Sequence, residues 1–509
     1  MTISTTPGKQ LDDQSISYRG NDRLLFGIIF GVLAFWLFAQ TTLNINVDMA
    51  KDLGMETSIM NIAVSITSLF SGIFIVVMGG LADRVGRLRI IRIGFLFSIV
   101  GSLLVGSTPA GSMATPVLIS GRILQGLSGA CIMPASLALL KAYWQDAARQ
   151  RAISLWSIGS WGGSGFCALF GGLVAQNLGW RYIFFASVII SVVGLLMIQG
   201  TPESKALAKK GKHKTDVTGI ITFMIVMIAL QVLVSKGSDM GWTSLISLAL
   251  MAVIMIFGMI FFRVENAKKE NAFINFGLFR NSVYTGATIS NFLLNGVAGI
   301  LIVSLMLMQV GGGLSAQSAG LLTLGYAIAI VAFIRIGEKL LQRFGHRKPM
   351  IWGCLIVAIS IMLLLPTYFM LDTYKILAIV SYTLFGVGLA FYATPSTDAA
   401  LSNLPEAAAG AGAGIYKMAS SLGAAFGVAI SAGIFVGLSS VDTPGSILDN
   451  VIHFQGKQDN VAIRQAAMIA LFFNLLMVVI AIIAIMKTVP GMKAKEKSVD
   501  ISATGNKLN

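Results

Sequence analysis

The chain has 509 residues, of which 55% are hydrophobic and only 12% are charged, and its mean hydropathy is +0.80. A water-soluble protein of this length needs far more charge to cover its surface, so the composition excludes a soluble protein and predicts a membrane protein. Residues 1–23 are polar, and the apolar run that follows is long enough to span a bilayer. We therefore expect this run to stay as an anchor and not to be cleaved as a signal peptide.

Fourteen apolar segments approach the length of about 20 residues that a membrane-spanning helix needs. An even number of spans places both ends of the chain on the same side of the membrane. We therefore predict an all-helical membrane protein with fourteen spans. The segments begin near Leu24, Ser58, Ile90, Thr115, Arg151, Trp180, Val217, Trp242, Val283, Ser318, Lys348, Lys375, Ala407 and Ile463.

The 37 lysine and arginine residues are distributed unevenly over this arrangement. On the side of the termini there are 28, in the loops of the other side 6, and within apolar segments 3. Because lysine and arginine are retained on the cytoplasmic side, both termini are predicted to be cytoplasmic. The net charge of +15 is then explained by topology and by attraction to anionic lipid, not by nucleic-acid binding.

Cysteine and histidine give no sign of a metal site. The three cysteines all lie in apolar segments, the three histidines fall in separate loops, and neither type has metal-ligand spacing. The sequence also lacks a nucleotide-binding loop and a nucleophile triad. We therefore expect no cofactor, no metal and no enzymatic activity, and an ion gradient as the energy source of any transport.

Between the second and third apolar segments lies the string GGLADRVGR, which begins at Gly79. Gly79 and Gly86 permit a tight turn at a helix end. Asp83 can accept hydrogen bonds from arginine or from a helix N-terminus across the gap between two helix bundles, while Arg84 and Arg87 hold the loop on the cytoplasmic face. Such a loop can latch one conformational state and release it in another. The alternative is an ordinary basic turn.

The chain resembles itself at an offset of about 260 residues, which is typical of transporters built from two related halves. The matching strings are QGLSGA at Gln125 and FGVGLA at Phe385, WSIGS at Trp156 and YKMAS at Tyr416, and GGLADRVGR at Gly79 with a degraded copy, QRFGHR, at Gln342. The predicted division is an N-terminal segment 1–23, a six-helix bundle 24–200, a basic linker 201–216, two extra helices 217–262, a linker 263–282, a second six-helix bundle 283–487 and a tail 488–509.

This plan and its motifs resemble the fourteen-helix drug:proton antiporters of the major facilitator superfamily, and most of all the Nor-type quinolone and multidrug exporters of Gram-positive bacteria. The resemblance covers residues 20–490. Its most specific strings are WSIGSWGGSG at Trp156, NFLLNGVAG at Asn291 and YATPSTD at Tyr392. The resemblance implies the facilitator fold and proton-driven export of amphipathic drugs, namely quinolones, cationic dyes and biocides, across the plasma membrane by alternating access.

Arg122 begins the string RILQG, which is similar to the proton-transfer motif of that family. A buried arginine is costly in hydrocarbon, so Arg122 should face the bundle interior and have polar partners. At a rise of 1.5 Å per residue, Gln40 lies about 24 Å above the inner edge of the membrane and Arg122 about 20 Å above it. Gln40 and Asn44 are therefore at a suitable height to meet Arg122, and Gln125 belongs to the same motif. The alternative is an arginine that reaches outward from a peripheral helix.

Two departures from the family pattern leave the proton-bearing carboxylate open. The fifth helix has Cys167-Ala168 where relatives carry a Gly-Pro pair, so it lacks the proline that would bend it. Many relatives carry an acidic residue in the first helix, where this chain has Gln40. The remaining candidates are Asp48, Asp398 and Glu338, each with the alternative of a helix-end interface charge, which we favour for Glu338. Lys417 either pairs with Asp398 or extends toward the membrane surface.

The substrate path is expected near the midplane between the two halves, where aromatic side chains suit flat, apolar drugs. For any single aromatic residue, simple helix packing is the alternative. The candidates are Asn44, Asn291, Asn295 and Lys417, with Trp36, Trp156, Trp161, Tyr326, Tyr392 and Tyr416. The expected partners are small amphipathic drugs, protons and the lipid bilayer of the plasma membrane, and we expect a monomer. The alternative function is a same-fold transporter of one specific solute, such as an osmolyte, a peptide or an organic acid.

Overall fold

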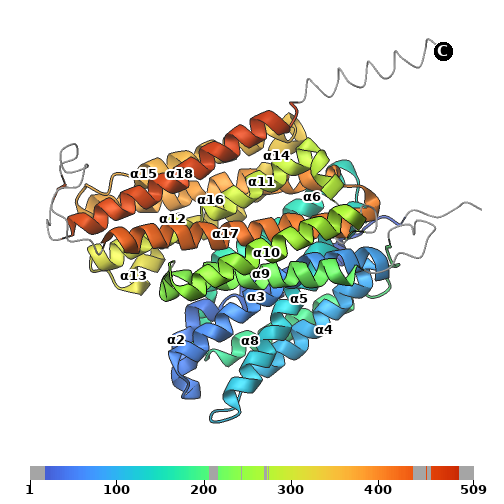
Figure 1. The fold of residues 1–509 in the computed structure, drawn as a ribbon, viewed down its shortest axis with the longest axis horizontal. Helices are drawn as coiled ribbons and strands as arrows, with labels where there is room; N and C mark the ends of the chain where they lie inside the picture. Colours follow the sequence, from blue (N-terminus) through green and yellow to red (C-terminus); the bar gives the residue numbers. More distant parts are fainter. Residues whose placement is uncertain are drawn as a thin grey trace, which may run out of the picture.

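The computed structural model describes residues 18–205, 216–241, 243–268, 272, 274, 276–439, 454–455 and 460–491. These residues form helices joined by short connections (Figure 1). The first group of helices is α1 (Asp22–Leu33), η1 (Ala34–Ala39), α2 (Thr42–Leu53), α3 (Thr57–Val85), α4 (Arg87–Gly106), α5 (Ala114–Tyr143), α6 (Asp146–Ser157), η2 (Ile158–Gly162), α7 (Gly163–Asn177) and α8 (Arg181–Met197).

Two helices, α9 (Val217–Met240) and α10 (Leu245–Lys268), follow the first group and pack against each other. We call them the inserted hairpin. The second group is η4 (Phe276–Arg280), α11 (Ser282–Gly296), α12 (Gly299–Met306), η5 (Leu307–Gly311), α13 (Ala316–Leu321), α14 (Leu324–Phe344), α15 (Arg347–Leu364), α16 (Leu371–Ser402), η6 (Glu406–Ala408), α17 (Ala409–Ser439) and α18 (Val461–Thr488).

The described residues contain 12 helices that are long and apolar enough to cross a membrane. The count rises to 13 if the bent run from α6 to α7 is one span. The helix α8 is apolar but has only 17 residues. The all-helical fold class is therefore confirmed, whereas the count of fourteen spans stays a prediction, as does the placement of the domain boundaries.

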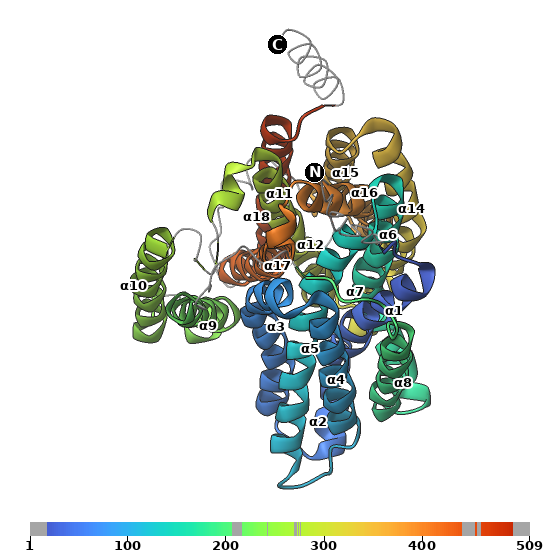
Figure 2. The same ribbon diagram turned by 90° about the vertical axis from the view of Figure 1, so that its right-hand side faces the viewer.

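The two groups of helices meet along α3 and α17, which lie side by side (Figure 2). The helix α9 packs against both of them, so the inserted hairpin covers this seam from one side (Figure 2). On the other side of the molecule, α14 and α16 of the second group contact α6 of the first. The helix α3 ends, α4 begins and α18 ends at one end of the bundle, which we call the terminal end (Figure 1).

Three wide turns of π-helix, η1, η2 and η5, interrupt the long apolar runs. A π-turn inserts one extra residue and changes the direction in which the following side chains point, and such turns are frequent at functional sites. Trp36 lies in η1 and Trp161 in η2, and both line a cavity between the two groups of helices. Both side chains were candidates from the sequence, but the sequence contains no signal for these turns.

The run from α6 to α7 bends by 55° just after Cys167, although it contains no proline there. The Thr41 hydroxyl donates a hydrogen bond to the Cys167 carbonyl at 3.1 Å, and the Cys167 thiol donates to the Ser164 carbonyl at 3.0 Å. Side chains that bond helix carbonyls locally weaken the backbone ladder and allow a kink. The missing proline therefore does not leave this helix straight.

At the end of the bundle opposite the terminal end, Asp52 of α2 binds α8. Its carboxylate accepts hydrogen bonds from the Trp180 indole at 3.1 Å and from the Arg181 guanidinium. The hydrogen bond from Arg181 is the main cause that lowers the pKa of Asp52 below its ordinary value, and the bond from Trp180 adds to it. These two hydrogen bonds fix α2 to the start of α8 within the first group.

Candidate functional site

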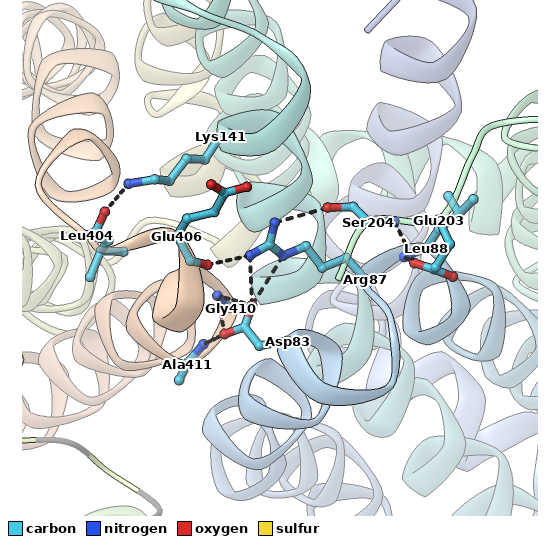
Figure 3. A network of polar contacts seen from close by, with 10 residues as sticks. All are labelled: Asp83, Arg87, Leu88, Lys141, Glu203, Ser204, Leu404, Glu406, Gly410 and Ala411. Carbon is cyan, nitrogen blue, oxygen red and sulfur yellow. Dashed lines mark hydrogen bonds and ion pairs between the residues drawn. The ribbon is translucent and has the colours of Figure 1, made fainter. Parts of the chain in front are cut away.

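A carboxylate at the end of α3 joins the two groups of helices at the terminal end (Figure 3). Asp83 accepts hydrogen bonds from the N–H of Gly410 at 2.8 and 2.9 Å and from the N–H of Ala411 at 3.0 Å, both in the first turn of α17. A helix N-terminus carries partial positive charge, so it stabilises an anion there. Asp83 also pairs with Arg87 at 3.0 Å, and Arg87 donates to the Glu406 carbonyl of the second group at 2.8 Å.

The backbones of α3 and α17 approach closely beside this carboxylate. A Cβ added to Gly79 would lie 2.3 Å from the Gly410 carbonyl oxygen, and one added to Gly410 would lie 2.3 Å from the Gly79 oxygen. Gly86 has φ +133°, a conformation that other residues rarely adopt. The string from Gly79 onward was expected to be a loop, and this is corrected: α3 continues to Val85 and Gly86 alone separates it from α4.

The arginines of this string have different surroundings. Arg84 is exposed, in accord with an interface charge. Arg87 is fully buried and also donates to the Ser204 hydroxyl at 3.1 Å. The neighbouring Glu203 accepts from the N–H groups of Leu88 at 2.8 Å and Arg89 at 3.0 Å, which caps the start of α4. The roles of Glu203 and Ser204 could not be predicted from the sequence, because the helix that they cap begins more than a hundred residues earlier.

A second contact between the groups, also missed in the sequence, involves Lys141 near the end of α5 (Figure 3). Its ammonium group donates to the carbonyl of Leu401 at 2.6 Å and to that of Leu404, at the end of α16. Cations are stabilised at helix C-termini, where carbonyl groups lack partners. Asp83 and Lys141 thus bind helix ends of the second group with opposite charges. We call these contacts, together with Arg87, the latch.

Asp398 of α16 forms a third contact between the groups. It is fully buried and accepts from Arg149 of α6 at 3.0 Å, from Gln150 at 3.4 Å and from the His346 ring nitrogen at 2.9 Å. Of the two alternatives left open for Lys417, the pairing with Asp398 is therefore not observed, because Asp398 binds Arg149 and His346 instead. His346, one of the three histidines placed in loops from the sequence, is half-buried here.

Arg122 of α5 is buried and connects three helices of the first group. Its Nη1 atom donates to the Ala39 carbonyl at 2.8 Å and to the Gln125 side-chain oxygen at 2.7 Å. Its Nε atom donates to the Ala63 carbonyl at 3.0 Å. The Gln125 amide in turn donates to the Ser102 hydroxyl at 3.2 Å. Among the described residues, the acceptors of the guanidinium are carbonyl and amide oxygens, so charge-assisted bonds fix the helix break after η1.

The structure differs from the expected neighbourhood of Arg122 in one respect. The expected acceptor was the Gln40 side chain, but the acceptor is the backbone carbonyl of the residue before it, which the break between η1 and α2 leaves available. Gln40 is half-buried and Asp48 is exposed on α2. The side chain of Asn44 lies outside the described part of the chain. Glu338 is buried and pairs with Arg335 and Gln342 on its own helix.

A cavity of about 140 Å³ lies between the two groups of helices. The first group contributes two tryptophans and two serines to its wall, and the second group contributes an amide, a lysine, aromatic rings and small side chains. Asn295 and Lys417, two of the candidates for the substrate path, are among its lining residues. The lining residues are Trp36, Ser160, Trp161, Ser164, Leu294, Asn295, Ala298, Leu301, Tyr326, Phe385, Leu389, Lys417, Ser420, Ser421 and Ala424.

Lys417 of α17 extends across the boundary between the groups toward two indole rings of the first group. Its Nζ atom lies 5.1 Å from the ring centroid of Trp156 and 5.8 Å from that of Trp36. These distances allow cation–π attraction. Among the described residues, no carboxylate acts on this ammonium group. Trp156 is itself buried, and its indole N–H donates to the Ser136 hydroxyl at 2.9 Å.

The other predicted substrate residues form a buried polar network behind the cavity. The Asn291 amide donates to the Ser420 hydroxyl at 2.6 Å and to the Tyr416 carbonyl at 2.9 Å. The Tyr392 and Tyr416 hydroxyl groups both bond the Ser396 hydroxyl at 2.9 Å. The cavity lining therefore does not include Asn291, Tyr392 or Tyr416. The network contacts the cavity through residues of its wall, such as Ser420.

Comparisons with known proteins agree with this architecture. The sequence profile of the Major Facilitator Superfamily matches residues 24–428 and 284–504. The quinolone resistance protein NorB of Staphylococcus aureus, from the strains MRSA252 and bovine RF122 / ET3-1, is 44% identical over 474 residues, which cover 93% of this chain and 97% of the relative. The solved structure of the proton:xylose symporter XylE, bound to 6-bromo-6-deoxy-D-glucose, has a TM-score of 0.60 at 17% identity and covers 93% of this chain and 97% of that chain.

Two groups of apolar helices around a central cavity, joined by charged contacts at one end, define a multi-pass membrane transporter. The chain belongs to the Major Facilitator Superfamily. Its Staphylococcus relatives are named as quinolone resistance proteins, whereas the likeness to XylE concerns the fold.

Proposed function

We propose that this protein exports amphipathic drugs, quinolones among them, across the plasma membrane in exchange for protons. The observation that carries the proposal is the 44% identity to NorB, extending over 93% of this chain and 97% of the relative. At this coverage the match extends over both groups of helices, including the segments of this chain that form the latch and the cavity.

The conformation supports alternating access. In the described residues, the hydrogen bonds between the two groups gather at the terminal end, through Asp83, Lys141 and Asp398. The terminal end is therefore closed in this state. Drug-sized ligands occupy pockets of about 300–1,000 Å³, and the cavity of about 140 Å³ is smaller. Binding of a drug thus requires the groups to move apart around the cavity.

The cavity chemistry supports a substrate that combines flat rings with an acidic group. Trp36, Trp161 and Tyr326 offer aromatic surface from both groups of helices. Lys417 supplies a positive charge that no described carboxylate neutralises. A quinolone carries a carboxylate on a flat ring system and can pair with that ammonium group. Cationic dyes and biocides, the other expected substrates, gain from the aromatic faces but are repelled by Lys417.

Proton coupling is the part of the proposal that depends on Arg122 and on a carboxylate. Asp398 is the candidate that the contacts favour, because its negative charge holds Arg149 of the other group at 3.0 Å. A proton on Asp398 would remove that charge and weaken the closed terminal end. Arg122 organises the first group and fixes the break after η1. Asp48, exposed on α2, remains the candidate for proton entry from the opposite side.

We further propose that the terminal end faces the cytoplasm and that the protein acts as a monomer. The excess of lysine and arginine on the side of the termini supports this orientation. Cysteines replacing Lys210 and Asn450, which both lie outside the described residues, test it. In a background without native cysteines, a membrane-impermeant reagent added to intact cells should label the cysteine at 450 and not the one at 210.

Transport of a fluorescent quinolone into inside-out vesicles tests the function directly. We expect uptake only when the vesicle interior is acidic, and collapse of the uptake when a protonophore is added. Uptake that depends on a sodium gradient instead would show that sodium, and not the proton, is the coupling ion. No quinolone uptake, together with pH-driven uptake of an osmolyte, a peptide or an organic acid, would favour the alternative of a single-solute transporter with this fold.

A further inference from the structure

Two carboxylates meet at the base of the inserted hairpin. Asp216 precedes α9, where its Oδ1 atom accepts from the N–H of Gly219 at 2.7 Å and forms an ion pair with Lys268. Glu265 lies near the end of α10, and its Oε2 atom accepts from the N–H of Ile274 at 2.9 Å. Each carboxylate thus has one oxygen bound to the protein backbone. Neither residue belongs to the latch or to the central cavity.

The remaining oxygens converge on one point. A Cβ placed on Gly219 would lie 2.2 Å from Glu265 Oε1 and 2.6 Å from Asp216 Oδ2, so these two oxygens are less than about 4.8 Å apart. Glu265 is 1% exposed and Asp216 is 3% exposed, so water has little access to either. Within the described residues, Glu265 Oε1 is buried without a hydrogen-bond donor. A buried, ionised carboxylate oxygen without a donor is strongly disfavoured.

Repulsion between the two carboxylates disfavours the state in which both groups are ionised. The charged groups that act on Glu265 among the described residues are Asp216, just before α9, and Lys268, on its own helix. Ionisation of both carboxyl groups would place two negative charges next to each other in a buried site. Closely spaced buried carboxylates avoid this repulsion by holding one proton between them.

We propose that Asp216 and Glu265 form a proton-binding site at neutral pH. Glu265 is the protonated partner: its Oε1–H donates to Asp216 Oδ2, while Oε2 continues to accept from Ile274. Asp216 stays ionised and keeps its contacts with Gly219 and Lys268. One proton therefore supplies the missing donor and leaves the ion pair between Asp216 and Lys268 intact.

The site fixes three parts of the chain to one another: the start of α9, the end of α10 and the segment that leads to α11. Because α9 packs against both α3 and α17, the hairpin base lies beside the seam between the two groups (Figure 2). Loss of the proton leaves two adjacent negative charges, which push α9 and α10 apart at their base. The hairpin is then less firmly held, so its attachment to the seam depends on pH.

Infrared spectroscopy of the full-length protein in detergent tests the site without any transport assay, because a protonated carboxyl group has a C=O stretch that carboxylates lack. At about pH 7, where exposed carboxyls are ionised, we expect the wild type to show this band and to lose it reversibly as the pH is raised. Glu265→Gln should lack the band. Asp216→Asn should lack it too, because Glu265 can then ionise and pair with Lys268.

Glu338→Gln is the matched control, because Glu338 is also buried but is paired with Arg335, so the variant should keep the band. Thermal unfolding gives a second readout: the wild type should lose stability on going to alkaline pH, and Glu265→Gln should lose less. The proposal is overturned if the wild type lacks the band at about pH 7, if Glu265→Gln keeps it, or if Asp216→Asn keeps it, which would mean that burial alone holds the proton.

Discussion

Both oxygens of Asp83 accept a hydrogen bond from the N–H of Gly410, a residue 327 positions later in the chain, at 2.9 and 2.8 Å. The two residues belong to different groups of helices, so this contact exists only while the terminal end is closed. Its strength depends on the full negative charge of the carboxylate at the start of α17. We therefore predict that the contact biases the equilibrium between the two ends of the transporter.

Asp83→Asn should reduce quinolone export about tenfold or more while the protein remains in the membrane. Asparagine keeps the size of the side chain but loses its charge, and a loss of about 1.5–3 kcal/mol is enough to shift a balanced equilibrium by that factor. Initial export rates normalised to protein amount give the measurement. Arg84→Gln, an exposed neighbour, is the control and should export normally. Near-normal export by Asp83→Asn would remove the gating role.

Gly79→Ala should open the terminal end. The new Cβ would lie 2.3 Å from the Gly410 carbonyl oxygen, so α3 and α17 cannot keep their present distance. A cysteine replacing the buried Leu404 reports the opening, because its labelling rate should rise. Gly72→Ala on the same helix meets no atom within 4 Å and should leave labelling unchanged. Equal labelling in both alanine variants would contradict the close contact.

Arg122→Lys should export poorly, more than tenfold below the wild type, and Arg122→Ala should lose pH-driven export. The guanidinium uses Nη1 and Nε to reach carbonyls on two other helices, and a single ammonium group cannot hold both positions. Quinolone binding without a gradient should survive in both variants. Parallel loss of binding and export would make Arg122 a structural or substrate residue, and normal export by Arg122→Ala would refute the role implied by the family motif.

Lys417→Gln should weaken quinolone binding about tenfold, because a carboxylate loses its charged partner in a partly dry site. Binding of a cationic dye should stay the same or become stronger. Equilibrium binding of both ligands to purified protein measures the change in preference. Ser160→Ala, which alters the same cavity wall without changing its charge, serves as the control. An equal loss for the acid and the cation would show that Lys417 supports the fold and not the selectivity.

The fold class follows from the sequence because membrane helices are local: each apolar run satisfies its own backbone hydrogen bonds. The bent run from α6 to α7 and the short helix α8 show the limit of this argument, since their lengths do not decide how they cross the bilayer. The π-turns that contain Trp36 and Trp161 could not be predicted from the sequence either, because they arise from packing between helices and have no simple sequence signal.

The residues of the candidate site could be predicted from the sequence where the chemistry of a side chain restricts the partners that it can have. A carboxylate at a helix end, such as Asp83, needs donors, and a buried arginine such as Arg122 needs acceptors. The identity of these partners could not be predicted from the sequence, because it depends on which distant segments of the chain come into contact. Asp398 illustrates this: the choice between Lys417 and Arg149 is decided by the meeting of α6 with α16. Their functional roles stay predictions.

The way Ser204 and Glu203 complete the start of α4 also determines where this polypeptide can be divided. Both residues lie at the start of the basic linker 201–216, so everything that the first group contributes to the described latch is encoded before residue 206. A break within 206–215 should leave two fragments with complementary surfaces at α3 and α17. Co-expression of these fragments should therefore assemble a working transporter from two separate chains, whereas a break before Glu203 should not.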